Sequence, residues 1–150
     1  MAQQTKEIIN RKAKFEYHFI SGFEAGLMLV GTEVKSLRKG EANMNDAFCY
    51  FKNGELFIRN LFIAEYDHGN VNNHDTRRER KLLLKKSELN KLERRATEKG
   101  FTIVPYKIFF SDRGFAKIEI FLAQGKKSYD KRDSIKQKDI QRDMDRQQKY

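Results

Sequence analysis

The stretch FTIVPYKIFFSDRGFAKIEIFL, residues 101–122, decides the fold. Two apolar runs rich in aromatic and β-branched residues flank a short polar segment that ends in Gly114, as expected of two strands joined by a turn. Four aliphatic residues of the second run alternate along the chain: Ala116, Ile118, Ile120 and Leu122. Because successive strand side chains point to opposite faces, this alternation predicts one buried face. Pro105 indicates an edge or a bulge, since proline cannot donate to a ladder.

A second hairpin is predicted upstream, where residues 47–51 and 56–63 flank Asn53-Gly54. Asn-Gly between apolar runs is a strong hairpin signal, because both central residues of the turn need positive φ. Residues 16–30 are predicted to form one long, bent strand, with Gly22 and Gly26 marking bulges.

Two helices are predicted between the strands. The first extends from an N-cap at Thr32 through Lys39, and the second from an N-cap at Ser87 to near Lys99. Five or six short antiparallel strands with intervening helices favour a mainly β fold. We predict a small closed antiparallel β-barrel of the oligonucleotide-binding (OB) type, with peripheral α-helices and a basic C-terminal tail. A β-sandwich of similar size fits the same pattern.

The net charge of +10 over 150 residues is unevenly distributed. Residues 1–75 are almost neutral, whereas residues 77–99 and 124–150 are each strongly basic. This distribution indicates a polyanionic partner, with nucleic acid favoured over an anionic membrane surface. All twelve Phe lie between Phe15 and Phe121, so we predict a folded RNA-binding body over residues 1–123. Residues 124–150 are too poor in apolar groups to fold alone, and we predict a tail that is disordered when free.

Several other classes of protein find little support. No apolar run approaches the roughly 18 residues that span a bilayer, and no secretory signal opens the chain. The single cysteine, Cys49, suits a reducing cytosol, so we expect a cytoplasmic protein. The three histidines show no metal-ligand spacing, and no nucleophile motif or phosphate loop occurs. We therefore predict no catalytic residue, metal or cofactor, although a nuclease built from scattered acidic residues stays open.

Three segments combine cations with other binding groups. Residues 10–17, NRKAKFEY, form either a solvated arm or an RNA contact, with Arg11, Lys12 and Lys14 on phosphates and Asn10 on a base or sugar. In residues 77–86, RRERKLLLKK, the cations either line a solvated helix face or form a docking surface, and the leucines favour the core. In residues 125–132, GKKSYDKR, an aromatic ring lies among charges, as in sites for single-stranded RNA.

These segments, together with residues 23–38, FEAGLMLVGTEVKSLR, resemble the SsrA-binding protein (small protein B) family, the bacterial partner of transfer-messenger RNA. The resemblance implies an OB barrel that binds the tRNA-like domain of that RNA. It implies delivery, together with elongation factor Tu and GTP, to ribosomes stalled on truncated messages. Translation then switches to the RNA's own reading frame, and the incomplete peptide is tagged in trans-translation. A general RNA-binding or ribosome-associated barrel is the alternative.

The resemblance also assigns residues. In the body it implies RNA contacts at Asn10, Glu24 and Leu83, beside the cations Arg78, Arg80 and Lys81. In the tail, which becomes helical in the messenger channel, it implies contacts with ribosomal RNA in the decoding region through Gly125, Lys126, Lys127, Tyr129, Asp130, Lys131 and Arg132. Some members of the family have His where this chain has Tyr129; both rings can stack on a base, but tyrosine does not become cationic near neutral pH.

Overall fold

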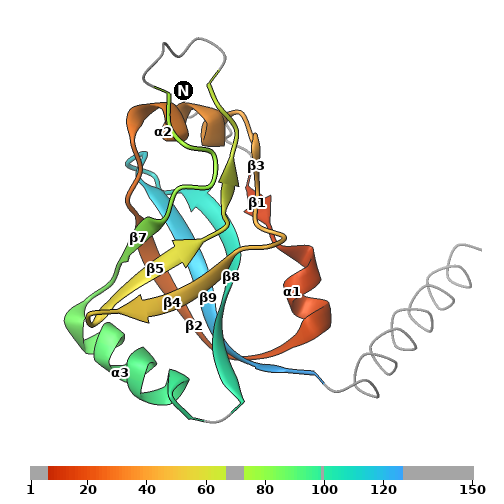
Figure 1. Cartoon of the computed structure of the whole chain (residues 1–150), viewed down its shortest axis with the longest axis vertical. Helices are drawn as coiled ribbons and strands as arrows, with labels where there is room; N and C mark the ends of the chain where they lie inside the picture. The colour runs from red at the N-terminus through yellow and green to blue at the C-terminus, as the bar shows by residue number, and fades with distance from the viewer. Residues whose placement is uncertain (1–6, 67–72, 99, 127–150) are drawn as a thin grey trace, which may run out of the picture.

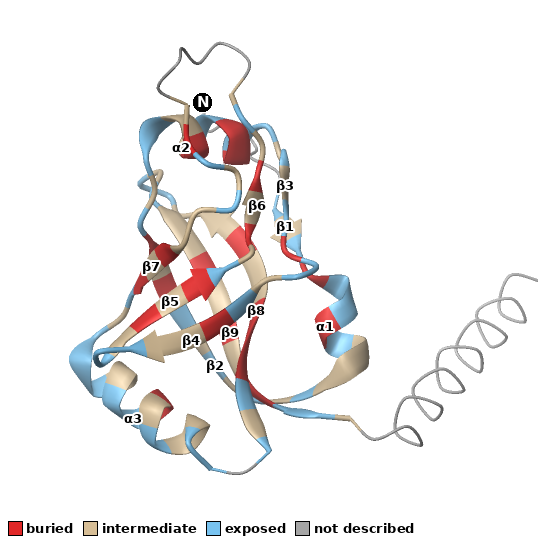
Figure 2. Ribbon diagram, in the orientation of Figure 1, coloured by how far each residue is buried: buried red, intermediate tan, exposed pale blue. Residues whose placement is uncertain are grey.

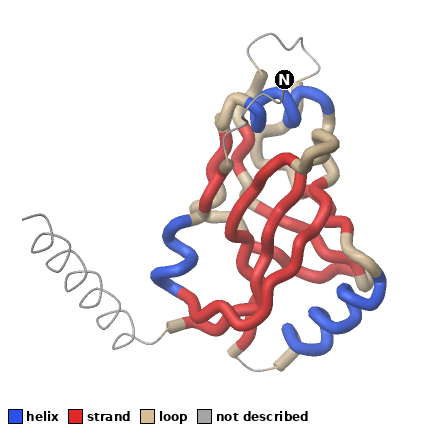
Figure 3. Tube along the Cα trace, turned by 180° about the vertical axis from the view of Figure 1, so that it is seen from behind, coloured by secondary structure: helices blue, strands red, loops and turns tan. Residues whose placement is uncertain are grey.

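A computed structural model describes residues 7–66, 73–98 and 100–126 of the chain (Figure 1). Strands are the commonest regular structure in this part, and helices lie at its margins (Figure 3). In chain order the elements are β1 (Ile8–Ile9), α1 (Arg11–Glu16), β2 (Tyr17–Leu27), α2 (Gly31–Arg38), β3 (Ala42–Asn43), β4 (Phe48–Lys52), β5 (Glu55–Arg59), β6 (Phe62–Ile63), β7 (Arg80–Leu83), α3 (Lys86–Ala96), β8 (Phe101–Phe110) and β9 (Ala116–Gly125). None of the helices in these ranges is long and apolar enough to cross a membrane.

Seven of the strands form one antiparallel sheet in the order β1-β8-β9-β2-β7-β5-β4, and β3 pairs with β6 separately. The sheet curls strongly, so that the edge strand β4 comes within 8 Å of β8, measured between Cα atoms. No hydrogen-bonded ladder joins these two strands in the described part of the chain. The mainly β, antiparallel prediction is therefore confirmed, while the ladder that would close a barrel is not found.

Both predicted hairpins are present. The β8–β9 ladder extends from Phe101↔Gln124 to Phe110↔Ala116, and a register shift between Pro105 and Lys107 is the predicted bulge. At the β4–β5 turn, Asn53 and Gly54 have φ of 55° and 76°. Local turn chemistry thus fixes the β4–β5 register, because few other residues accept these dihedrals.

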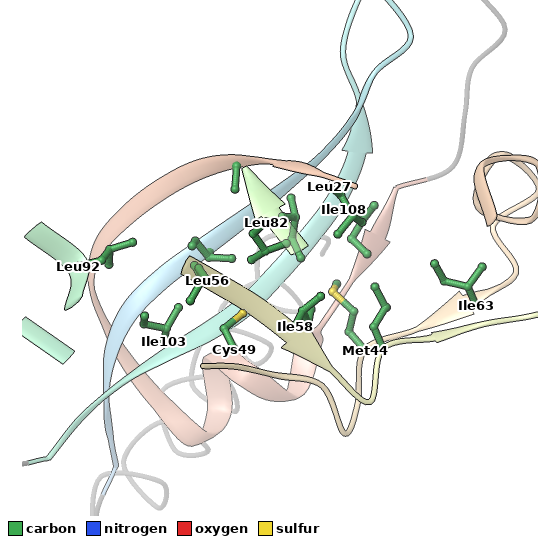
Figure 4. Close-up of a cluster of buried hydrophobic side chains, with 14 of the residues drawn as sticks. Leu27, Met44, Cys49, Leu56, Ile58, Ile63, Leu82, Leu92, Ile103 and Ile108 are labelled. Atoms are coloured by element: carbon green, nitrogen blue, oxygen red, sulfur yellow. The ribbon is translucent and has the colours of Figure 1, made fainter. Parts of the chain in front are cut away.

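The core lies inside the curl of the sheet (Figure 4). Buried positions alternate with half-buried ones along β5 and the middle of β9, as Figure 2 shows, and Cys49 is the buried position of β4. Inward side chains of β9 belong to the same buried cluster as Leu56, Ile58 and Leu82, and Leu92 of α3 adds to it from one end. The predicted apolar face of residues 116–122 is therefore confirmed.

Two local predictions about the N-terminal part of the body are corrected by the structure. The bulge of β2 lies at Ile20, where the register shifts between Phe19 and Ser21, and not at Gly22 or Gly26. The two glycines instead allow close packing, because a Cβ at Gly22 would lie 2.9 Å from the Phe121 ring. Residues 11–16 form a helix rather than an arm, since Ala13 is buried against Val104 and Ala123.

The cations and leucines of residues 80–83 lie on strand β7 and not on a helix face. The two longer helices also begin earlier than predicted, because a glutamate in the first turn caps each of them. Glu33 accepts a hydrogen bond from the amide of Val30 at 3.0 Å, and Glu88 accepts one from Lys85 at 3.3 Å. Thr32 and Ser87 therefore lie inside α2 and α3.

Candidate RNA interface

Glu24 and Leu83 lie on the outer face of the sheet, where β2 pairs with β7. Ala25 and Leu27 of β2 point into the core, so Glu24 and Gly26 point outward. Leu83 pairs with Gly26 and is 49% exposed. A Cβ at Gly26 would lie 3.3 Å from that of Leu83, so the glycine leaves space for the leucine. Leu83 is thus an apolar side chain held outside the core, suited to pack against an unstacked base.

Glu24 has an acidic neighbour across the sheet. It pairs with Glu119 of β9, which in turn pairs with Lys107 of β8. Two carboxylates opposite each other on one face repel, so this arrangement does not favour stability. An exposed carboxylate here is suited to accept hydrogen bonds from base amino groups or ribose hydroxyls.

Arg80 is the clearest correction among the predicted contacts. Its side chain is completely buried, forms an ion pair with Glu33 of α2, and donates to the carbonyl of Leu61 at 2.6 Å. Burial lowers the pKa of Arg80, and the Glu33 charge opposes this effect. Arg80 therefore anchors α2 to the sheet and offers no cation to RNA.

Two neighbouring cations are also engaged but remain at the surface. Nη2 of Arg78 lies 2.7 Å from Oε1 of Glu33, and the Arg78 side chain is 38% exposed. Nζ of Lys81 lies 2.8 Å from Oε1 of Glu55. Both side chains can contribute positive charge near Leu83, but each already neutralises a carboxylate.

Asn10 is buried between α1 and β8. Its Nδ2 donates to the carbonyl of Pro105 at 3.0 Å, and its backbone amide donates to Tyr106 at 2.7 Å. Its Oδ1 is enclosed and has no hydrogen-bond partner in the described part of the chain. These bonds give Asn10 a structural role, and because Asn10 also lines a hollow beside α1, the predicted base contact stays a prediction.

The cations that follow Asn10 lie at the surface, and their contact with phosphates stays a prediction. Arg11, Lys12 and Lys14 are exposed on α1, and this helix packs at one side of the sheet (Figure 1). Lys12 lies 3.6 Å from Glu16, and Nζ of Lys14 lies 5.0 Å from the centre of the Tyr106 ring. The exposed surface of α1 therefore carries positive charge that suits phosphates. This charge lies at a distance from Leu83, because α1 and β7 are at opposite sides of the sheet (Figure 1).

Only the start of the predicted tail is described. Gly125, the last residue of β9, pairs with Tyr17, and the backbone amide of Lys126 donates to the backbone carbonyl of Glu16 at 2.8 Å. The sheet therefore continues beyond the predicted boundary at residue 123. The other predicted ribosome contacts lie outside the described residues: Lys127, Tyr129, Asp130, Lys131 and Arg132.

The side chains that suggested other chemistry have structural partners. His74 is buried, with Nδ1 2.8 Å from the hydroxyl of Thr32 and Nε2 2.9 Å from the carbonyl of Ile63. Burial raises the pKa of the Cys49 thiol far above its ordinary value, which leaves it a poor nucleophile. Across the described ranges, no group of three potential metal ligands converges.

Sequence reasoning missed a row of aromatic rings on the outer face of β4 and β5. Phe48, Tyr50 and Phe57 share this face, and Cys49 points inward between the first two. The alternation of residues 48–50 already contained the signal, but no prediction used it.

Comparison with known proteins identifies the family. A family profile described as "SmpB protein" matches residues 7–150. The chain belongs to the SmpB family. The SsrA-binding protein of Phocaeicola vulgatus is 54% identical over 139 residues, covering 93% of each chain. That of Bacteroides thetaiotaomicron is 51% identical over 146 residues, covering 97% of each.

A solved structure also resembles this SmpB-family chain. It is described as "tmRNA-SmpB: a journey to the center of the bacterial ribosome", and its similar chain is 48% identical with a TM-score of 0.69. The match covers 81% of this chain and 85% of the other. At that identity, the likeness extends to sequence as well as fold.

Proposed function

We propose that this protein binds the tRNA-like domain of transfer-messenger RNA and delivers it to stalled ribosomes for trans-translation. The observation that carries the proposal is membership of the SmpB family over residues 7–150, with relatives named SsrA-binding protein. The structure adds a matching surface, in which the exposed Leu83 and Glu24 lie on adjacent strands. The role is non-catalytic and cytoplasmic, and it requires no cofactor.

The division of labour is between body and tail. The body holds the RNA through Leu83, Glu24, the cations of α1 and Lys81 of β7. Elongation factor Tu with GTP joins through the RNA complex. Residues 125–132 contact ribosomal RNA in the decoding region, where the tail becomes helical in an empty messenger channel. Bound messenger would occupy the same space, so the tail senses that the channel is empty.

The fold that supports this function is an OB barrel with peripheral helices. The strong curl that brings β4 within 8 Å of β8 supports this assignment. OB folds bind nucleic acid on the outer face of their strands and on the adjoining loops. The positions of Leu83 and Glu24 on outward faces agree with that mode of binding.

The decisive experiment measures binding of purified Leu83→Ala and Glu24→Ala proteins to the tRNA-like domain over a salt series. Each variant is expected to bind about tenfold more weakly, because each loses a contact of roughly 1–3 kcal/mol. Glu98→Ala, which removes an exposed carboxylate after α3, is the matched control and should bind normally. Unchanged affinity of both test variants would contradict the assigned surface.

Competition separates this function from general RNA binding. Ordinary tRNA should displace the tRNA-like domain only weakly; equal displacement would favour a general RNA-binding barrel. Incubating RNA with the protein and Mg²⁺ tests the nuclease alternative, and we expect the RNA to remain intact.

A further inference from the structure

The predicted RNA contacts form two groups that are separated on the surface. Leu83 and Lys81 lie on β7, whereas Lys12 lies on α1, beyond the other edge of the β7-β5-β4 part of the sheet. Figure 1 shows β7, β5 and β4 side by side, with no described helix crossing the face toward the viewer. An RNA that contacts both groups by this route would lie across the outer face of these three strands.

Aromatic side chains occupy this route. Lys81 pairs with Phe57 of β5, and Phe57 pairs with Tyr50 of β4, so the three side chains lie in one cross-strand row. The Phe57 and Tyr50 rings are 6.1 Å apart with an interplanar angle of 30°, and Phe48 lies 5.9 Å from Tyr50. Phe48 is 44% exposed. An exposed ring of this size contributes little to the core and offers a flat face to solvent.

The charges around the rings suit a polyanion. The Arg59 guanidinium lies 5.9 Å from the centre of the Tyr50 ring, and Lys52 is exposed on the same strand face as Tyr50. Two carboxylates beside Phe57 and Tyr50 are engaged: Glu55 pairs with Lys81, and Glu79 accepts the hydrogen bond of the Tyr50 hydroxyl. That hydrogen bond raises the pKa of Tyr50 above its ordinary value, which already lies well above physiological pH.

The row of rings leads to a hollow beside α1. A cavity of about 230 Å³ is lined by both Phe48 and Lys12, together with Glu16, Asn45 and Asp46. This space is several times that of a water molecule. It connects the aromatic row to a cation already predicted to contact phosphate.

We propose that a single-stranded stretch of the bound RNA crosses β7, β5 and β4, with successive unstacked bases on Phe57, Tyr50 and Phe48, and so joins the Leu83 contact to the α1 cations. The inference rests on the proposed function for the identity of the RNA. Aromatic rings with flanking cations are the usual means of holding single strands, because every base has a stacking face. Membrane or protein partners fit less well, since cations and rings alternate here without a continuous apolar surface.

The test compares variants that remove a ring with variants that keep it. Phe48→Leu, Tyr50→Leu and Phe57→Leu should each weaken binding to the tRNA-like domain about tenfold. The slope of log affinity against log salt should not change, because no phosphate contact is lost. Phe48→Tyr, Tyr50→Phe and Phe57→Tyr keep the rings and should bind within about twofold of the unaltered protein.

Two controls make the result specific. Phe115→Leu removes a ring that is 63% exposed at the β8–β9 hairpin, away from this route, and should not affect binding. Melting curves of every variant show whether a loss of RNA binding arises from unfolding. If a leucine variant is unfolded, the variants that keep the ring decide the outcome. Weak RNA binding by these variants in the folded state would overturn the inference.

The two proposals fail in different ways. If Leu83→Ala weakens binding but the three leucine variants bind normally, the aromatic route is wrong and the proposed function stands. Loss of ribosome association alone, with RNA binding intact, would likewise overturn the inference. Failure of the unaltered protein to bind the RNA would overturn the proposed function itself.

Discussion

Asn10 is a buried amide that joins α1 to β8 and also lines the hollow beside α1. Its side-chain amide donates to the carbonyl of Pro105, the residue at which the β8 register shifts. Its backbone carbonyl accepts a hydrogen bond from the amide of Ala13 at 3.2 Å, in the first turn of α1. These bonds fix the direction in which α1 leaves the sheet. We therefore regard Asn10 as a positioning residue for the cations of α1.

Asn10→Ala should lower the free energy of unfolding by about 1–3 kcal/mol, because the Pro105 carbonyl loses its buried donor. Thermal or urea unfolding measures this change. Asn90→Ala, at an exposed position of α3, is the control and should be nearly neutral. An Asn10→Ala protein of unaltered stability that fails to bind RNA would show that Asn10 contacts the RNA after all.

At the scale of elements, the junction between α2 and β7 depends on a buried ion cluster. Burial disfavours the charged form of Glu33, but hydrogen bonds from Arg78, the Val30 amide and Arg80 outweigh it, so the pKa of Glu33 lies below its ordinary value. The Arg80 side chain also reaches the Leu61 carbonyl. Helix, strand and the segment before β6 are therefore held by one carboxylate and two guanidinium groups.

Glu33→Gln should destabilise the protein by about 3 kcal/mol near neutral pH, because it leaves the Arg80 charge buried without its partner. The folded pKa of Glu33 is lowered, so its contribution is complete above the unfolded value of 4.5 and is lost as pH falls through the folded value. The unaltered protein should thus lose stability below about pH 4.5 more steeply than Glu33→Gln.

Unfolding free energies of both proteins between pH 7 and pH 3 measure this difference. Glu65→Gln removes an exposed carboxylate and serves as the control, with a pH profile expected to follow that of the unaltered protein. Parallel pH profiles for Glu33→Gln and the unaltered protein would contradict the role of the ion cluster.

Hairpins were more predictable than their connections. Asn53-Gly54 and the alternation along residues 116–122 are local signals, and both appear where predicted. α1 and β7 were not recognised, because neither has a strong pattern of its own. Six residues of α1 become helical through packing of Ala13 against the sheet, and β7 becomes a strand by pairing with β2 and β5.

At the scale of the whole molecule, the structure changes where body and tail can be separated. β9 pairs with β2 as far as Gly125, and the Lys126 amide donates to Glu16. A truncation after Leu122 would therefore remove part of the central ladder. A truncation after Lys126 leaves every described strand intact.

Deletion of residues 127–150 should leave binding to the tRNA-like domain within about twofold, since the contacts of the body remain. Tagging of incomplete peptides on stalled ribosomes should disappear, because the proposed decoding-region contacts are lost. RNA-binding curves and a translation assay on messages without a stop codon measure the two effects. Loss of RNA binding together with tagging would contradict the division between body and tail.

The sequence by itself determined the antiparallel hairpins, the inward face of β9 and the location of positive charge. These features depend on neighbouring residues, through the period of two along a strand and the dihedrals that Asn-Gly turns require. The resemblance carried by four segments of the chain was sufficient to name the family, which the comparisons confirmed.

Only the tertiary structure decided which polar side chains reach the surface. Arg80 and Asn10 are polar residues like Lys81 and Lys12, yet both are buried. Arg80 binds Glu33, which is 47 residues away in the sequence, and Asn10 binds Pro105, which is 95 residues away. The reason is physical: a buried charge or amide is tolerated only where distant elements bring it a partner. The same folding places Phe48, Tyr50 and Phe57 outside the core, between the two groups of predicted RNA contacts.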